Sequence, residues 1–376
     1  MTAAPAKGWK LFIPGPTHVR QEIREAMALP MISHRGDEMK QLLADLLPGL
    51  RSAFGTRGDV ITLSCTSTAA MEAVTRSVVR PGQRVIHLTN GNFSRVWWEL
   101  SDACGFDAVN CELEWGDAWD EERTAAALRK HGPADAVMIT HCETSTGALA
   151  DVAGVARAVR AVCPEALLCN DVTSSVGGLP IDFDATGQDI ALGGVQKCWA
   201  LPPALVTGAM SERAKARMAA NKGRGLASDY LHTLKFQQET GMTIMTPGLP
   251  QMQALRRQLR DIEASGGFAA RFRRHEEMQK LVLDWAAARG LPILARPGAR
   301  SAAVTSIGCG GRFAIAELIA GLMAAGYFIQ PGYGKTAPTH WRIGHMGDHT
   351  PRCVQELLDV TDGVLKRLGA RLAVPA

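Results

Sequence analysis

The sequence lacks any long apolar run, and no stretch approaches the roughly 20 residues that a membrane-spanning helix needs. The segment MTAAPAKGWKLFIPGP also lacks the basic stretch and following apolar stretch of a secretory signal. The 41 basic and 37 acidic residues leave a formal net charge of only +4, and no basic block interleaves with aromatics. We therefore expect neither a membrane nor a nucleic-acid partner, but a small molecule.

Disulfide and metal signals are absent too. The nine cysteines are scattered, odd in number and form no CxxC pair, which argues against a disulfide framework and favours a reducing, cytoplasmic location. His340, His345 and His349 lie close in sequence, but Gly344 and Gly347 disfavour a helix that would align them as ligands. We expect no metal site.

Short β-rich runs alternating with helical stretches dominate residues 59–210. The strand candidates are DVITLSC, RVIHLTNG, DAVMITHCE, ALLCNDV, DIALGG and LVTGAM, and residues 68–79 and 151–162 are candidate crossover helices. Such alternation predicts a doubly wound α/β domain with a largely parallel sheet. With 376 residues, 46% of them hydrophobic, the chain is long enough for a second domain.

The pattern changes past residue 250. A helix with Met252, Leu255, Leu259 and Ile262 on one face is predicted to end at Gly266-Gly267. Strands at 302–307, 327–329 and 341–344 and helices at 313–322 and 352–368 then indicate a smaller α+β domain. We predict an N-terminal arm (1–20), a large domain (21–255) and a small C-terminal domain (256–376).

Polar residues follow the strand candidates, where open parallel sheets bind ligands. Thr66, Ser67 and Thr68 precede a helical AAMEAV and suit either a phosphate site or a simple helix cap. Phe93 follows the second strand and could cover a planar ring or belong to the core. The polar segment HCETSTG after the third strand needs partners, from a ligand or from a turn.

A carboxylate and an amine follow the next two strands. Asp171 ends an apolar run, where a carboxylate could pair with a protonated pyridine nitrogen; the alternatives are a helix cap or a salt bridge with an arginine. Lys197 is flanked by glycines, Cys198 and Trp199, and desolvation there would free its amine for Schiff-base chemistry. The alternative for Lys197 is an ordinary surface lysine.

Together these features resemble the class V aminotransferases of pyridoxal phosphate (PLP) fold type I, in particular the alanine–glyoxylate and serine–glyoxylate group. The resemblance implies a mainly parallel, seven-stranded-type sheet in the large α/β domain and a smaller C-terminal α+β domain. The residues that carry it are Pro14-Gly15-Pro16-Thr17, Ser33-His34-Arg35, residues 66–73, Asn90-Gly91, residues 143–147, Asp171, Gln196-Lys197, Pro202-Pro203, Thr246-Pro247 and residues 342–347.

The resemblance also implies a role for each matching position. Lys197 would form the Schiff base with PLP, and Asp171 would hold the pyridine nitrogen protonated. Arg342, with Gly15, would bind the substrate, gripping its carboxylate through a two-pronged contact. The other cofactor contacts would come from Phe93 stacked on the ring, from Thr66, Ser67, Thr68 and Gln196 at the phosphate, from Thr146, and from Thr246 of the neighbouring subunit of a homodimer.

The implied reaction is a ping-pong transfer of an amino group from a small amino acid, of the alanine or serine type, to glyoxylate or pyruvate through a pyridoxamine phosphate form. Two alternatives are a 2-aminoethylphosphonate–pyruvate and a pyridoxamine–pyruvate aminotransferase. A third is a lyase or desulfurase, which would need a reactive cysteine such as Cys142 or Cys198. Thr68, Ala204 and Thr243 depart from residues that are usual in the glyoxylate group.

Overall fold

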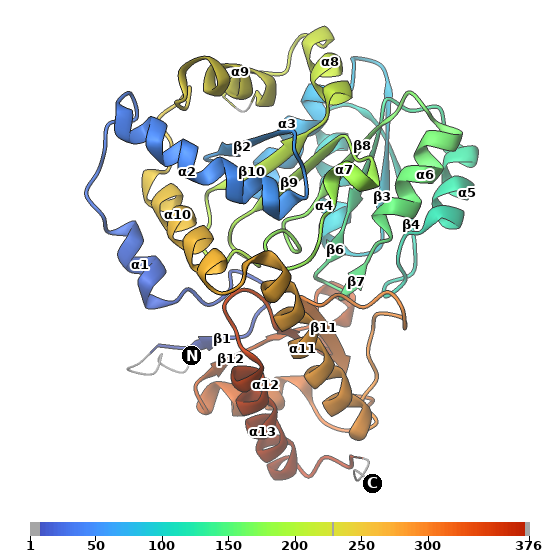
Figure 1. Ribbon diagram of the computed structural model, residues 1–376. Helices are drawn as coiled ribbons and strands as arrows, with labels where there is room; N and C mark the ends of the chain where they lie inside the picture. The colour runs from blue at the N-terminus through green and yellow to red at the C-terminus, as the bar shows by residue number, and fades with distance from the viewer. Residues whose placement is uncertain (1–7, 228, 373–376) are drawn as a thin grey trace.

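A seven-stranded sheet forms the centre of the computed structural model, which describes residues 8–227 and 229–372 (Figure 1). The strand order is β2-β10-β9-β8-β5-β3-β4. β10 is antiparallel to both neighbours, and the other neighbouring pairs are parallel. The strands are β2 (Asp59–Leu63), β3 (Arg84–Thr89), β4 (Asp107–Glu112), β5 (Ala136–Thr140), β8 (Leu167–Asp171), β9 (Ile190–Gly194) and β10 (Val206–Met210). The predicted doubly wound α/β class is confirmed.

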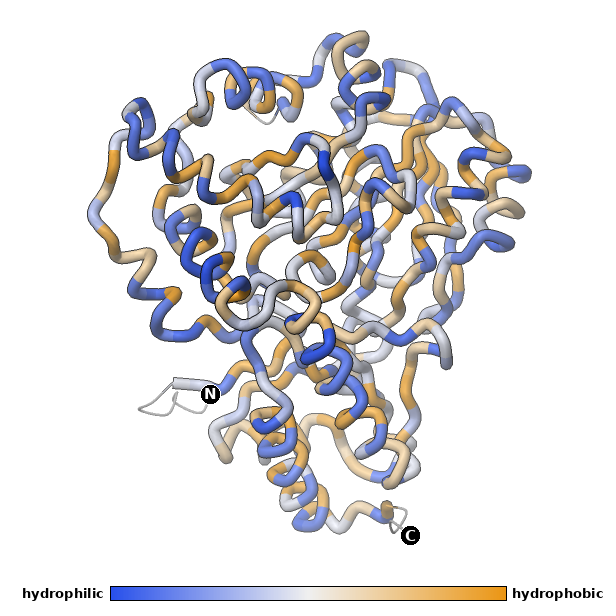
Figure 2. The backbone as a smooth tube through the Cα atoms, in the orientation of Figure 1, coloured by the Kyte–Doolittle hydropathy of each residue, from blue (hydrophilic) through white to orange (hydrophobic). Residues whose placement is uncertain are grey.

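Helices cover both faces of this sheet because successive strand residues point to opposite sides. Val60 packs into a core with α2 (Asp37–Phe54) and α10 (Leu249–Ala264), whereas Ile61 packs into a core with α3 (Ser67–Val78) and α9 (Tyr230–Thr240). Hydrophobic residues accordingly follow the central strands, and hydrophilic residues gather on the outer helices (Figure 2). The remaining helices of this part are α1 (Gln21–Met27), α4 (Asn92–Ala103), α5 (Glu121–His131), α6 (Val152–Val162), α7 (Phe183–Thr186) and α8 (Glu212–Ala220).

The C-terminal part contains a three-stranded antiparallel sheet of β11 (Val304–Gly308), β14 (His340–Gly344) and β13 (Gln330–Pro331). Three helices share its core: α11 (Gly267–Ala288), α12 (Ile315–Ala324) and α13 (Pro351–Arg367). Of the predicted N-terminal arm, residues 1–7 lie outside the described residues. Residues 10–12 join the C-terminal part, since β1 (Lys10–Leu11) pairs with β12 (Tyr327–Phe328) and Phe12 is buried in the same core.

The elements missing from the sequence-based prediction include α11 and β4. The predicted helix does end next to Gly266-Gly267, since α10 ends at Ala264, but α11 begins at Gly267 and continues for 22 residues. Its first buried side chains are Arg271 and His275, and Met278 is its first fully buried apolar residue. The edge strand β4 is also missing from the prediction, because its sequence DAVNCE is mostly half-exposed and lacks a β-rich run.

Ala204, one of the departures from the glyoxylate group, has a backbone conformation that favours glycine. Its φ is +81°, in the left-handed region that costs an alanine about 1–2 kcal/mol relative to a right-handed conformation. Glycine adopts this conformation without the Cβ clash. The position therefore favours the glycine that is usual there.

In the part of the chain that the structure describes, no helix is both long and apolar enough to cross a bilayer. The nine cysteines are all free. Two of the histidines considered as ligands make structural contacts: His345 Nε2 lies 2.8 Å from Thr305 Oγ1, and His349 Nε2 lies 2.9 Å from the Leu11 carbonyl. No group of His, Cys, Asp or Glu with metal-site geometry occurs among the described residues.

Candidate active site

Lys197 lies just beyond the carboxyl end of β9, where the sequence placed it. It is buried, and its Nζ donates hydrogen bonds to Ser174 Oγ (2.9 Å) and Thr144 Oγ1 (3.1 Å). Burial lowers the pKa of Lys197 below its usual value, although the Asp171 carboxylate acts in the opposite direction. Two hydroxyls thus hold an amine that loses its proton more readily than an exposed lysine does.

Two other predicted residues contact the Lys197 side chain. The Phe93 ring centroid lies 4.7 Å from Nζ, so an aromatic face lies beside the amine. Gly15 lies along the methylenes, and a Cβ at this position would come within 3.0 Å of Lys197 Cγ. A larger residue at Gly15 would therefore push the lysine out of position.

Asp171 ends β8, the neighbour of β9, and is buried. Its Oδ1 accepts a 2.9 Å hydrogen bond from the Thr173 amide. No Lys, Arg or His nitrogen of the described residues lies within 4.0 Å of its carboxylate. Burial raises the pKa of Asp171 above its usual value. The arginine partner considered for this carboxylate is therefore not present among the described residues.

Arg342 comes to this edge from β14 of the C-terminal part. Its guanidinium is buried and donates to three oxygens: Pro331 O (3.0 Å), Thr144 O (3.3 Å) and Gln330 Oε1 (3.3 Å). It forms no ion pair with any described carboxylate, and burial lowers the pKa of Arg342 to about 10. Thr144 connects the two cations, since its hydroxyl binds Lys197 and its carbonyl binds Arg342.

The predicted phosphate residues lie at the start of α3. Thr66 caps this helix, because its Oγ1 accepts the Ala69 amide at 3.1 Å. The Ser67 hydroxyl accepts a 3.3 Å hydrogen bond from Gln196 Nε2, and a side chain at Gly194 would clash with both residues. Thr68 is exposed. Gly194 thus lets the Ser67 hydroxyl and the Gln196 amide come close together at a helix N-terminus, and this combination of groups suits an anion.

Residues 17–327 match the Aminotransferase class-V family. The chain belongs to the class V aminotransferases. It is 32% identical to an uncharacterised aminotransferase of Methanocaldococcus jannaschii, covering 96% of this chain and 93% of that one. It is 30% identical to a serine–glyoxylate aminotransferase of Methylorubrum extorquens, covering 90% and 86%. The crystal structure of a ureidoglycine–glyoxylate aminotransferase of Bacillus subtilis superposes with a TM-score of 0.88 at 26% identity, over 99% and 96% of the chains.

Class V aminotransferases imply PLP, and the residues at this edge fit it. The planar pyridine ring carries a nitrogen that is cationic when protonated, and Asp171 is a buried carboxylate without a cation. The cofactor's aldehyde needs an amine of lowered pKa, which Lys197 supplies. The phosphate needs an anion site, which the start of α3 supplies. The fit rests on three separate features of one edge.

Thr146 and Thr246, both predicted to bind the cofactor, have hydrogen-bond partners other than Lys197 and Asp171 in this aminotransferase. Thr146 is buried, and its hydroxyl binds backbone only, at the Glu143 carbonyl (3.4 Å) and the Ala148 amide (3.3 Å). Thr246 is exposed, with its hydroxyl 3.5 Å from His34 Nε2. Arg35 donates to the Ile244 carbonyl (2.6 Å) and so holds the loop that carries Thr246.

The prediction did not single out three side chains that build the site. Thr144 and Ser174 hold the amine of Lys197 from loops distant in sequence. Glu143 is fully buried and accepts the amides of Phe93 (3.0 Å) and Ser94 (2.9 Å), which fixes the start of α4. Glu143 and Thr144 fall in the polar segment that the sequence analysis noted, so the segment was the available signal. Nothing local to Ser174 indicated its contact.

The two cysteines considered for a lyase or desulfurase are buried. Cys142 Sγ lies 3.0 Å from Ser301 Oγ, and Cys198 Sγ donates to the Ser174 carbonyl at 3.3 Å. Burial raises the pKa of each thiol to about 12. Thiols of such high pKa are protonated at neutral pH and are poor nucleophiles. These two cysteines have structural contacts and do not favour the cysteine-dependent reaction.

Proposed function

We propose that this aminotransferase uses PLP to move an amino group from a small amino acid to glyoxylate or a similar 2-oxo acid. One observation carries the proposal: Lys197, Asp171 and Arg342 are buried at one edge of the sheet without an oppositely charged partner among the described residues. The named relatives support glyoxylate as acceptor, because their donors, serine and ureidoglycine, differ while their acceptor is the same.

In this proposal most residues of the candidate site have a role in binding the cofactor or in moving a proton. Lys197 would hold the cofactor and would move the proton at the donor's Cα, with Thr144 and Ser174 holding its Nζ. Asp171 would pair with the ring nitrogen, and Phe93 would cover the ring. Ser67, Thr68, Gln196 and the start of α3, which Thr66 caps, would hold the phosphate. When bound, PLP withdraws electrons from the donor's Cα, which makes its proton removable.

Arg342 sets the class of donor in the proposal. Its planar guanidinium can bind both oxygens of a carboxylate, and Gly15 leaves room beside Lys197. A donor with an α-carboxylate gives Arg342 the counter-ion that it lacks. 2-Aminoethylphosphonate and pyridoxamine have no α-carboxylate, so in the two alternative reactions Arg342 would bind a carboxylate only on the acceptor pyruvate.

The assembly we propose is a cytoplasmic homodimer in which Thr246 reaches the neighbouring subunit's phosphate site. Thr246 is exposed, and large apolar side chains are exposed at Met245 (41%) and at Met31 (70%), close in sequence to His34. Covering such side chains favours association. The free cysteines fit a reducing compartment. Sedimentation analysis of the holoenzyme would test the dimer.

Spectroscopy and donor screening test the reaction. The purified protein with PLP should show a visible absorption band, and borohydride should fix the cofactor on Lys197, as peptide mass spectrometry would detect. Single additions of serine, alanine, aspartate, 2-aminoethylphosphonate and pyridoxamine should bleach the band only with the amino acids. Glyoxylate should then restore it. Bleaching by the aminophosphonate alone, or ammonia or sulfide release without an acceptor, would overturn the proposal.

Replacing Arg342 tests the donor contact. Arg342→Lys keeps the charge but loses the two-pronged geometry. Losing one charged hydrogen bond costs about 1.5–3 kcal/mol, so the KM for carboxylate donors should rise roughly tenfold to a hundredfold. Steady-state kinetics measure this, with Arg296→Lys as a control because Arg296 is an exposed, ion-paired arginine. An unchanged KM in Arg342→Lys would contradict the assignment.

A further inference from the structure

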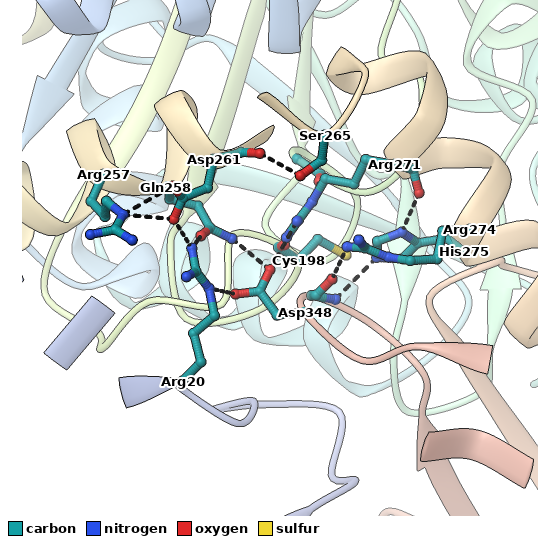
Figure 3. Close-up of polar contacts among 12 residues, drawn as sticks. Arg20, Cys198, Arg257, Gln258, Asp261, Ser265, Arg271, Arg274, His275 and Asp348 are labelled. Atoms are coloured by element: carbon teal, nitrogen blue, oxygen red, sulfur yellow. Dashed lines mark hydrogen bonds and ion pairs between the residues drawn. The ribbon is translucent and has the colours of Figure 1, made fainter. Parts of the chain in front are cut away.

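A cavity lined by arginines lies apart from the candidate active site of Lys197, Asp171 and Arg342. It has a volume of about 530 Å³ and lies where the C-terminal end of α10 meets the start of α11. Four arginines line it: Arg20, Arg257, Arg271 and Arg274. Figure 3 shows them with the carboxylates of Asp261 and Asp348. Arginines clustered around a cavity are a common means of binding anions.

Three of these arginines already have carboxylate partners. Arg20 Nε donates to Asp348 (2.8 Å), and Arg20 Nη2 also bonds to Asp261. Arg257 Nε lies 2.8 Å from the Asp261 carboxylate, and Arg271 Nη1 lies 2.9 Å from that of Asp348. These ion pairs account for both aspartates of the cavity.

Arg274 differs from the other three. No carboxylate of the described residues lies within 4.0 Å of its guanidinium, and its one hydrogen bond there is from Nη2 to the Gly347 carbonyl (3.0 Å). Its Nε is buried and has no hydrogen-bond partner among the described residues. Burial and the neighbouring Arg271 lower the pKa of Arg274, as burial does for Arg342. Both arginines are partly desolvated cations without a counter-ion.

We propose that the cavity binds a small oxyanion, a carboxylate or a phosphate, on the guanidinium of Arg274. The four arginines face three carboxylates in the lining, those of Glu22, Asp261 and Asp348. One positive charge is therefore left for the anion to neutralise. The small side chains of Ala264 and Ala270 also line the cavity. This site is separate from the proposed reaction, because its lining includes none of the residues assigned to cofactor or donor.

The cavity adjoins two segments that reach the active site. Arg271 donates to the carbonyl of Cys198, the residue after Lys197, and Arg274 donates to that of Gly347, three residues after the strand of Arg342. An anion on Arg274 would add contacts where α11 packs on these segments. Binding should therefore raise the melting temperature of the holoenzyme.

The experiment titrates the PLP-loaded enzyme with inorganic phosphate in one arm and malonate in the other, by calorimetry at constant ionic strength. Arg274→Gln is compared with Arg273→Gln, which removes the same charge from the exposed neighbour outside the cavity. Wild type and Arg273→Gln should bind saturably, and Arg274→Gln about tenfold more weakly or worse. The arm with the lower dissociation constant distinguishes phosphate from carboxylate.

A second variant keeps the test decisive if Arg274→Gln does not fold. Ala270→Glu places a carboxylate one turn before Arg274 on the same helix face, where it can pair with the guanidinium and occupy the cavity. It should abolish binding and the anion-dependent rise in melting temperature. Equal affinity in Arg273→Gln and Arg274→Gln, unaltered binding in Ala270→Glu, or no saturable binding in either arm would overturn the proposal.

Discussion

The two edges of the central sheet treat buried charge in opposite ways. At the amino ends of the strands, Asp135 precedes β5 and lies 2.5 Å from Arg80, while Asp189 precedes β9 and lies 2.6 Å from Arg160. At the carboxyl end of the same β9, Lys197 has no carboxylate within 4.0 Å among the described residues. The two ends of β9 thus differ: Asp189 before the strand has an ion-pair partner, and Lys197 after it has none among the described residues.

The eight buried Asp, Glu, Lys and Arg residues of the described part also divide into paired and unpaired charges, although Asp229 and Arg271 lie on helix elements and not at a strand end. Four have an ion-pair partner, and these are Asp135, Asp189, Asp229 and Arg271. The other four belong to the candidate site, and these are Glu143, Asp171, Lys197 and Arg342. Burying an unpaired charge is costly, so a fold keeps one where a ligand supplies the partner. We therefore infer that the paired charges stabilise the fold and that the unpaired ones mark the proposed binding site.

Removing the unpaired amine should have the largest effect on activity. Lys197→Ala should lower turnover by about a thousandfold or more, because it removes both the cofactor's attachment and the proton-transferring group. The apo form should be no less stable than wild type, since the amine is buried without a carboxylate partner. Assays of kcat and apo-protein melting measure the two effects.

The matched control is Lys215→Ala, which removes a lysine that is paired with Asp59 at the amino edge. Its turnover should stay within about twofold of wild type, because the residue touches nothing at the carboxyl edge. If Lys197→Ala turned over normally, or if both variants lost activity equally, the division between the two edges would be wrong.

Breaking a pair at the amino edge should act on stability alone. Asp189→Ala leaves Arg160 without its partner and removes the acceptor of the Leu168 amide. The free energy of unfolding should fall by about 3 kcal/mol, the lower end for breaking a buried pair, because Arg160 is partly solvated. Urea denaturation measures the loss. A fall in kcat of the folded variant comparable to that of Lys197→Ala would refute the comparison.

The sequence predicted that Asp171 and Lys197 would lie at the same edge of the sheet, because both lie at or just beyond the ends of strands that were recognised from their apolar runs. Asp171 and Lys197 each come at or just after an apolar run, and parallel strands bring such positions to one edge. It could not predict that β10 runs antiparallel, since the run LVTGAM carries no signal of direction. The fold class therefore followed from local pattern, while one strand's direction depended on tertiary packing.

The contacts that tune the site were beyond sequence reasoning. Thr144 lies 53 residues and Ser174 23 residues from Lys197 along the chain, so only the fold brings their hydroxyls to the amine. The same holds for Arg274, which lies on a helix whose first buried residues are polar and which the apolar pattern did not reveal. Charged and hydroxyl side chains at a distance leave no periodic signal.

The smallest expected effect is a pH dependence of stability, measured on the apo protein with Asp171→Asn. Burial raises the pKa of Asp171 above 3.8, so the folded state holds this proton to higher pH than the unfolded state does. Between the two pKa values the folded state binds more protons, and the wild type's free energy of unfolding falls as pH rises. Asp171→Asn has no carboxyl group to titrate at this position. Its free energy of unfolding relative to wild type should therefore rise with pH above about 3.8.

Asp135→Asn should show the opposite trend, in urea denaturation over the same acidic series. Burial alone would raise the pKa of Asp135, but hydrogen bonds from Arg80 hold it below 3.8. Wild type should therefore be more stable than Asp135→Asn above that pH and lose the advantage as pH falls through the lowered pKa. For each variant, the free energy of unfolding relative to wild type is plotted against pH. Slopes of the same sign would mean that the two carboxylates have similar environments, and the contrast between the edges would fail. Opposite slopes would locate the uncompensated charge at the carboxyl edge, independently of any assay of turnover.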